Sequence, residues 1–184
     1  MQARGPLMIE HRLIERVLGA VRKALLQIEG GQGVDPVFID TVVDFIRTYA
    51  DRTHHGKEED ILFEKLKLKK MAARDLKAMQ ELVQEHVLGR ETTRQLVEAN
   101  QRHRSGDPKA LTAVAAALRA LAEFYPNHIM KEDQDFFPSI RRYFLEAEEQ
   151  ALLVEFREFD QQMIHEKYAS VAKMLEGSAG PSRT

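Results

Sequence analysis

The chain of 184 residues contains no cysteine. Disulfides, thiolate metal sites, iron–sulfur ligation by this chain and a cysteine nucleophile are therefore all excluded. Any metal that this chain binds must be held by histidine and carboxylate side chains.

The sequence also lacks a long apolar run and an excess of charge of one sign. No stretch approaches the ~20 apolar residues that a membrane-spanning helix needs, and the first residues lack the charged-then-apolar pattern of a secretory signal. With 27 basic and 29 acidic residues, the chain has no basic surface of the kind that binds nucleic acid or anionic membranes. We expect a cytoplasmic protein that binds neither nucleic acid nor membrane.

No stretch alternates apolar and polar residues with the period of two that is typical of strands. Apolar residues instead recur at steps of three and four, as in Leu7, Ile14, Leu18 and Val21, and this spacing predicts helices. Glycine and proline mark breaks at residues 30–36, 105–108 and 138. We predict four long helices at about residues 6–29, 36–66, 72–104 and 108–137, and a C-terminal helical segment at about 139–176.

Short connections make sequential helices antiparallel neighbours. We therefore predict an all-α fold, namely an up-down-up-down four-helix bundle with an additional C-terminal helical segment. The length suits one domain, and 43% apolar and 30% charged residues are ordinary for a globular protein. We expect this domain to span residues 1–176 and residues 177–184 to form a disordered tail.

One motif occurs twice in the chain. The segment HHGKEEDILF, which begins at His54, returns as HIMKEDQDFF from His128, and the pair Glu-His at residues 10 and 11 recurs at residues 85 and 86. His128 follows His54 by 74 residues, and His86 follows His11 by 75 residues. The repeat therefore predicts one helical hairpin that occurs twice, with a lone histidine on its first helix and His-x-x-x-Glu on its second.

The repeated histidines and glutamates lie on apolar helix faces. Residues four apart share one face of a helix, so each His-x-x-x-Glu pair can bind one centre. On the second helix, this pair follows the apolar stripe through Ile46 and Ala50. The predicted inward set is His11, His54, Glu58, His86, His128 and Glu132.

Two carboxylates on core faces require cations or protons, because an unpaired buried carboxylate costs several kcal/mol. Mixed imidazole and carboxylate ligands suit iron, manganese or zinc, and six side chains exceed what one tetrahedral zinc requires. The set predicts a dinuclear metal site with room for a bridging oxygen, oxo or hydroxo.

Other polar residues near the motifs are interpreted differently. With α-helical periodicity His55 and Glu59 share a stripe with Thr48 and Arg52 and are expected at the periphery, unless the register is shifted by one residue. His103 lies among polar residues and is expected on the surface. For His165, in the segment MIHEKY, the sequence leaves a role near the site open.

These motifs together resemble the hemerythrin-like family, in its HHE cation-binding branch. The resembling residues are Glu10-His11, HHGKEEDILF, Gln84-Glu85-His86 with Gly89-Arg90, and HIMKEDQDFF with Pro138. With the later acidic stretch 146–149 and HEKY, the resemblance covers about residues 7–176. It implies a non-haem centre of two iron ions in a four-helix bundle, with His11, His54, His86 and His128 as terminal ligands and Glu58 and Glu132 as bridging carboxylates.

The chain departs from the family's oxygen carriers at two positions. Arg90 stands where they have a second histidine on the third helix, and Glu132 competes with Asp133 for their closing aspartate position. Fewer histidines and more carboxylates argue against reversible oxygen carriage. The cysteine-bearing segment of the family's iron–sulfur repair branch and the Glu-x-x-His signature of ferritin-like proteins are both absent from this sequence.

We therefore predict a cytoplasmic di-iron protein that binds or reduces a small oxidant, namely dioxygen, peroxide or nitric oxide, in sensing, detoxification or iron homeostasis. The alternative is a metal-responsive interaction module without turnover, in which metal loading orders the bundle and changes a surface for an unidentified protein partner. Peroxide consumption favours the first hypothesis, and metal-dependent partner binding without turnover favours the second.

Overall fold

The computed structural model describes residues 2–178, except for the side chains of residue 166 and residues 168–178. Helix α1 (Arg4–Glu29) comes first. The second long helix consists of α2 (Pro36–Phe45), two π-helical segments, η1 (Ile46–His55) and η2 (Lys57–Leu62), and α3 (Phe63–Lys67). Then follow α4 (Ala73–Arg104), α5 (Ala110–Met130), the π-helical η3 (Lys131–Phe136), α6 (Phe137–Ile140), the 3-10 turn η4 (Arg141–Tyr143) and α7 (Glu146–Ser178).

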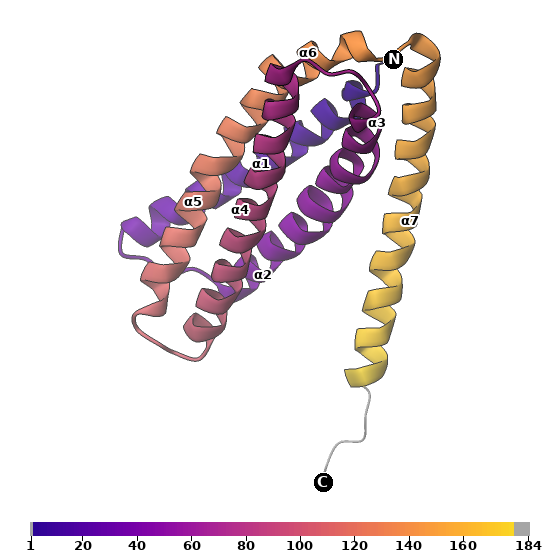
Figure 1. The fold of residues 1–184 in the computed structure, drawn as a ribbon. Coiled ribbons are helices and arrows are strands. Elements are labelled where there is room, and N and C mark those ends of the chain that lie inside the picture. Colours follow the sequence, from indigo (N-terminus) through magenta and orange to yellow (C-terminus); the bar gives the residue numbers. More distant parts are fainter. Residues whose placement is uncertain (1, 179–184) are drawn as a thin grey trace.

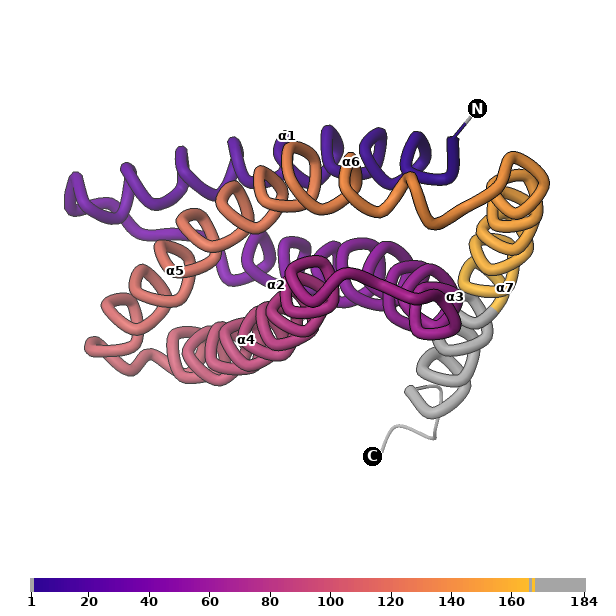
Figure 2. Tube along the Cα trace, turned by 45° about the horizontal axis from the view of Figure 1, so that its top comes forward, coloured from indigo at the N-terminus to yellow at the C-terminus, as the bar shows by residue number. Residues whose placement is uncertain are grey.

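The described part of the chain contains helices and no strand, so the all-α prediction is confirmed. The helices α1, α2, α4 and α5 lie alongside one another, whereas α7 lies outside them, next to the second long helix (Figures 1 and 2). Among the described residues, no helix combines the length and apolar character needed to cross a membrane.

The predicted helix breaks follow from local chemistry. Asp35 accepts a hydrogen bond from the backbone amide of Val37 at 2.8 Å and so caps α2, which has Pro36 in its first turn. Gly31 and Gly106 have φ values of +80° and +81°, in the left-handed region that glycine adopts without strain. These residues end α1 and α4 where the sequence predicted the breaks.

The prediction of a break at Pro138 is wrong. The helix continues through this residue to Ile140, and α7 begins at Glu146 rather than near residue 139. Pro138 is tolerated because it lies in the first turn of α6, directly after η3, where its missing amide hydrogen removes no hydrogen bond of that helix. Of the predicted tail, residues 177 and 178 belong to α7, and residues 179–184 lie outside the described part.

A buried polar layer separates two apolar clusters along the bundle. On α1, for example, Leu7 belongs to one cluster and Ile14 to the other, and His11 lies between them. The cluster that contains Ile14 continues through Leu96 and Leu118, whereas the cluster that contains Leu7 includes residues of α7 such as Phe156. The polar layer is therefore isolated from water by apolar side chains at both ends.

Candidate metal centre

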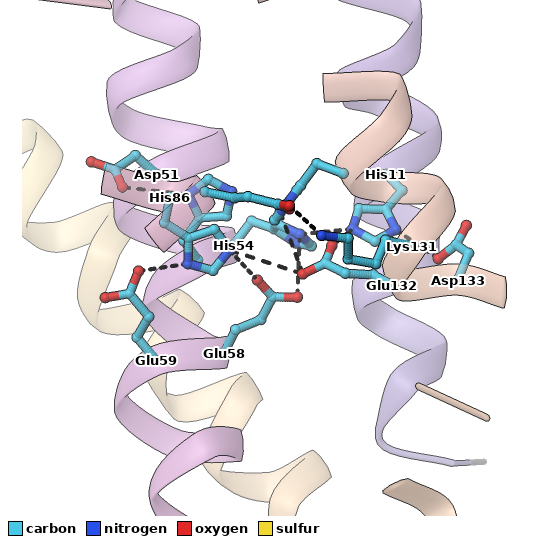
Figure 3. A network of polar contacts seen from close by, with 12 residues as sticks. His11, Asp51, His54, Glu58, Glu59, His86, Lys131, Glu132 and Asp133 are labelled. Carbon is cyan, nitrogen blue, oxygen red and sulfur yellow. Dashed lines mark hydrogen bonds and ion pairs between the residues drawn. The ribbon is translucent and has the colours of Figure 1, made fainter. Parts of the chain in front are cut away.

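The six residues predicted to face inward come together in this polar layer. None is more than 2% exposed. Figure 3 shows the carboxylates of Glu58 and Glu132 directed toward one another, with His54, His86 and His11 around them. The six side chains therefore form one buried cluster, to which α1, the second long helix, α4, and the α5–η3 helix all contribute.

The four predicted histidines are oriented by four carboxylates outside the cluster, here called the outer carboxylates. An ionised carboxylate only accepts hydrogen bonds, so each histidine Nδ1 must carry the proton and donate it. The Nε2 lone pair of each neutral imidazole is then free for a metal. The donations are His54 to Glu10 at 2.9 Å, His11 to Asp133 at 2.8 Å, His86 to Glu59 at 2.7 Å and His128 to Glu85 at 2.8 Å.

Cations hold the outer carboxylates in their ionised form. Burial raises the pKa values of Glu10, Glu59 and Glu85, but hydrogen bonds from the histidines and from a lysine or arginine outweigh burial and lower all three. The cationic donors are Lys57 for Glu10, Arg90 for Glu59 and Lys131 for Glu85, and Arg12 pairs with Asp133.

Each of the two central glutamates faces two different histidines. Glu58 Oε1 lies 3.6 Å from Nε2 of His54, and its Oε2 lies 3.4 Å from Nε2 of His86. Glu132 Oε2 lies 3.1 Å from Nε2 of His11, and its Oε1 lies 3.4 Å from Nε2 of His128. Both carboxylates thus extend from one pair of imidazoles to the other.

The central atoms need positive charge between them. Both carboxylate oxygens of Glu58 and of Glu132, and the Nε2 atoms of His86 and His128, are buried without a hydrogen bond. Lone pairs that face each other in a dry site are costly unless a cation or proton lies between them. The donor atoms of the cluster therefore have the chemistry of a metal site.

The spacing of these atoms also suits metal ions. Donor atoms of His11, His54, Glu58 and Glu132 lie within 4.8 Å of one another, and so do those of His55, His86 and His128. Bonds of about 2.0 to 2.2 Å to nitrogen and oxygen place opposite ligands of one ion about 4 Å apart. Small side-chain movements are enough to close either group around a cation.

In the metal-free protein, protons compensate part of the buried charge. Burial lowers the pKa of His11, but the neighbouring carboxylates of Asp133 and Glu132 outweigh burial and raise that pKa to about 9. Protonated His11 can then donate from Nε2 to Nε2 of His54, 2.9 Å away. Burial and the charge of Glu132 raise the pKa of Glu58 well above its ordinary value, which favours the protonated form of this carboxyl when metal is absent.

Comparison with family models gives a match that covers most of the chain. The model of the Hemerythrin HHE cation binding domain matches residues 6–140, which include all six predicted ligands. The chain belongs to the hemerythrin HHE family. Comparison with curated proteins and with solved structures found no match. The matched residues of the HHE domain end at α6, so α7 lies outside them.

His55 is a fifth histidine beside the buried cluster, although the sequence interpretation placed it at the periphery. His55 is only 2% exposed, and its ring stacks on that of His86 at 3.8 Å between centroids. Its Nδ1 is buried without a hydrogen bond. The peripheral prediction was wrong because η1 is π-helical, and the wider turn reduces the angle between adjacent side chains, so His54 and His55 both face inward.

The structure also places the other polar residues that the sequence singled out. The side chain of Glu59 is 25% exposed, as predicted, and that of Asp133 is 11% exposed, and each orients one histidine of the cluster. His103 was expected on the surface but is half-buried, because it donates from Nε2 to the backbone oxygen of Val34 at 3.0 Å. His165 is an exposed residue of α7 and is not part of either ligand group.

Sequence reasoning missed the roles of two glutamates of the HHE domain and of the lysines that bind them. The signal was present, because the Glu-His pair and the His-x-x-Lys segment both recur. In the first half of the repeat, Lys57 binds Glu10, and Glu10 orients His54. In the second half, Lys131 binds Glu85, and Glu85 orients His128.

Proposed function

We propose that this HHE domain is a single unit over residues 1–176, an up-down-up-down four-helix bundle that holds two iron ions and binds or reduces a small oxidant in the cytoplasm. The observation that carries the proposal is the placement of Glu58 and Glu132, each with one carboxylate oxygen toward each group of histidines. Two carboxylates shared in this way suit two neighbouring cations and would be redundant for one.

The two ions would have unequal ligand sets. His11 and His54 would bind one ion, whereas His55, His86 and His128 would bind the other, and the central glutamates would bridge the two. Five imidazoles with two carboxylates exceed the needs of a tetrahedral zinc and suit iron. Zinc and manganese are the alternatives that metal analysis distinguishes.

Iron bound in this cluster would supply the electrons for reduction of dioxygen, peroxide or nitric oxide. The residues of the chain orient the donor atoms and exclude water. The outer carboxylates fix the histidine rings, since each holds one Nδ1 proton. Phe63 and Phe137 stack on His86 and His11 at 6.3 and 5.9 Å between centroids, and so they shield one side of the cluster from solvent.

A cavity beside the cluster would give a small molecule a route to it. It has a volume of about 300 Å³ and extends from exposed arginines on η1 and α4 to the buried side chains of His55 and Tyr125. A cavity of this size is large enough to admit a diatomic molecule or peroxide. Gly89 lies in its wall, where a Cβ atom would come within 3.2 Å of the ring of Phe124.

Turnover by the iron-loaded protein tests this proposal. We expect anaerobically reduced, iron-loaded protein to consume at least one of dioxygen, peroxide and nitric oxide in more than one cycle when a reductant is supplied. The same protein loaded with zinc is the matched control and should consume none. Iron-dependent binding of a protein partner without consumption of any oxidant would instead support the metal-responsive interaction module.

Replacement of His55 tests the unequal ligand sets. The equivalent position in the other half of the repeat is Ile129, a buried residue, so His55→Ile introduces a side chain that this fold already accommodates. We expect this variant to bind one metal normally and the second at least about tenfold more weakly. Metal content measured during dialysis against a graded chelator series gives the result, with the exposed His165→Gln as control. Two ions retained with unchanged affinity would contradict a ligand role for His55.

A further inference from the structure

The two halves of the repeat differ in the solvent exposure of an equivalent lysine. Lys57 and Lys131 occupy equivalent positions, and each binds the glutamate that orients a histidine of the cluster. The side chain of Lys57 is 0% exposed, whereas that of Lys131 is 33% exposed. The fold therefore encloses the lysine in the first half and leaves it in contact with solvent in the second.

Helix α7 accounts for this difference. Asp160 of α7 accepts a hydrogen bond from Nζ of Lys57 at 2.6 Å. One residue earlier, Phe159 lies so close to Gly56 that a Cβ atom at that glycine would be 2.7 Å from its ring. The equivalent of Gly56 in the second half is Met130, which is 50% exposed. Only the first half thus has the glycine and the lysine that seat α7.

A chain of hydrogen bonds runs from α7 to the metal cluster. Lys57 donates both to Asp160 and to Glu10, and Glu10 accepts the Nδ1 proton of His54 at 2.9 Å. The Nε2 atom of His54 belongs to the predicted ligand group with Glu58. Two side chains, those of Lys57 and Glu10, therefore connect Asp160 of α7 to His54 of the metal cluster.

The charges make the hydrogen bonds between Asp160, Lys57, Glu10 and His54 depend on one another. A buried ammonium group is stable only with good compensation, and here one lysine lies between two carboxylates. If α7 separates from η2, Lys57 loses Asp160 and gains access to water. The hydrogen bond from Lys57 to Glu10 then weakens, and Glu10 orients the ring of His54 less strictly.

We propose that α7 is a docking arm that positions His54, and that Asp160 is the positioning residue through Lys57 and Glu10. The proposal rests on the proposed function in one respect, which is that the cluster holds metal. A bound ion favours the orientation of His54 that docked α7 imposes, so metal loading stabilises the docked arm. By linkage, docking strengthens metal retention by the same factor.

Asp160→Asn tests the coupling, because it keeps the shape of the side chain and removes its charge. Two controls match it: Glu158→Gln, an exposed residue of the same helix, and Glu81→Gln, whose carboxylate lies 3.8 Å from Lys131 in the other half. In an equilibrium competition with a chelator, we expect Asp160→Asn to bind iron about tenfold more weakly than the wild type. Both controls should bind iron with the wild-type affinity.

Hydrogen exchange of α7 provides a measurement that a purely structural role would not change. Iron should increase the protection of backbone amides at residues 152–160 in the wild type, and Asp160→Asn should abolish that increase. Wild-type protein that binds iron without added protection of α7, or a variant that retains iron as the wild type does, overturns the coupling alone. Wild-type protein that binds no metal overturns both the coupling and the proposed function.

Discussion

Removal of metal by a chelator at about pH 7.5 is expected to lower the unfolding temperature of the iron-loaded protein by about 10 °C. A ligand present at about 1,000 times its dissociation constant stabilises the fold by about 4 kcal/mol, and each kcal/mol shifts the unfolding temperature of a chain of this size by about 2 to 4 °C. The metal-free fold must also bury Glu58 and Glu132 without hydrogen bonds to their carboxylate oxygens.

The difference in unfolding temperature should shrink toward pH 5. Burial and Glu132 raise the pKa of Glu58, so the metal-free fold is penalised above the ordinary glutamate value of about 4.3. Burial lowers the pKa of His54 to about 4, and stability linked to this histidine is lost as the pH falls from about 6.5 toward that value. Protons at His11 and Glu58, whose pKa values are raised, also compete with metal, so acid weakens the loaded form most.

Thermal unfolding with and without chelator, between about pH 5 and pH 8, measures this effect. Zinc-loaded protein is a useful companion sample, because it separates the stability due to any cation from that due to iron. An unfolding temperature at about pH 7.5 that does not respond to the chelator would mean that the cluster is not a buried metal site.

Replacement of Glu58 is expected to empty the site. Its two oxygens face histidines of both groups, so Glu58→Gln removes a negative charge from both metal positions at once. Glu59→Gln should weaken metal binding only about 10- to 100-fold, because Glu59 acts by orienting His86. Asp60→Asn is the control, since Asp60 is exposed and belongs to neither ligand group.

Metal content after gel filtration in dilute chelator should therefore increase in the order Glu58→Gln, Glu59→Gln and Asp60→Asn. Circular dichroism of each variant establishes that the helices are retained. If Glu59→Gln emptied the site while Glu58→Gln stayed filled, the inward register of η2 would be wrong by one residue.

Much of the fold could be predicted because its determinants are local. The apolar spacing, the Asp-Pro pair that begins α2 and the glycines that end α1 and α4 can all be recognised in the sequence. They define the first three long helices to within a few residues. Pro138 misled the prediction because the helix changes its hydrogen-bond pattern just before that residue. A π-helical segment has no simple sequence signal, since it depends on packing around the cluster.

The site residues that the sequence did not reveal also depend on packing between distant segments. The six inward residues follow from a repeat and from α-helical faces, and the structure brings all six together. His55 required knowledge of the π-helical turn, and Asp160 required knowledge of where α7 packs. A contact between residues about one hundred positions apart in the chain leaves no periodic pattern that a single sequence could reveal.

Metal analysis of protein purified with its native metal, combined with an absorption spectrum before and after exposure of the reduced protein to air, tests the central claim most directly. We predict about two irons per chain and a spectrum that changes on exposure to air, because seven buried donor side chains in two groups suit two redox-active ions. One zinc per chain, no affinity for ferrous iron and a spectrum unchanged by air would contradict a di-iron centre in this protein.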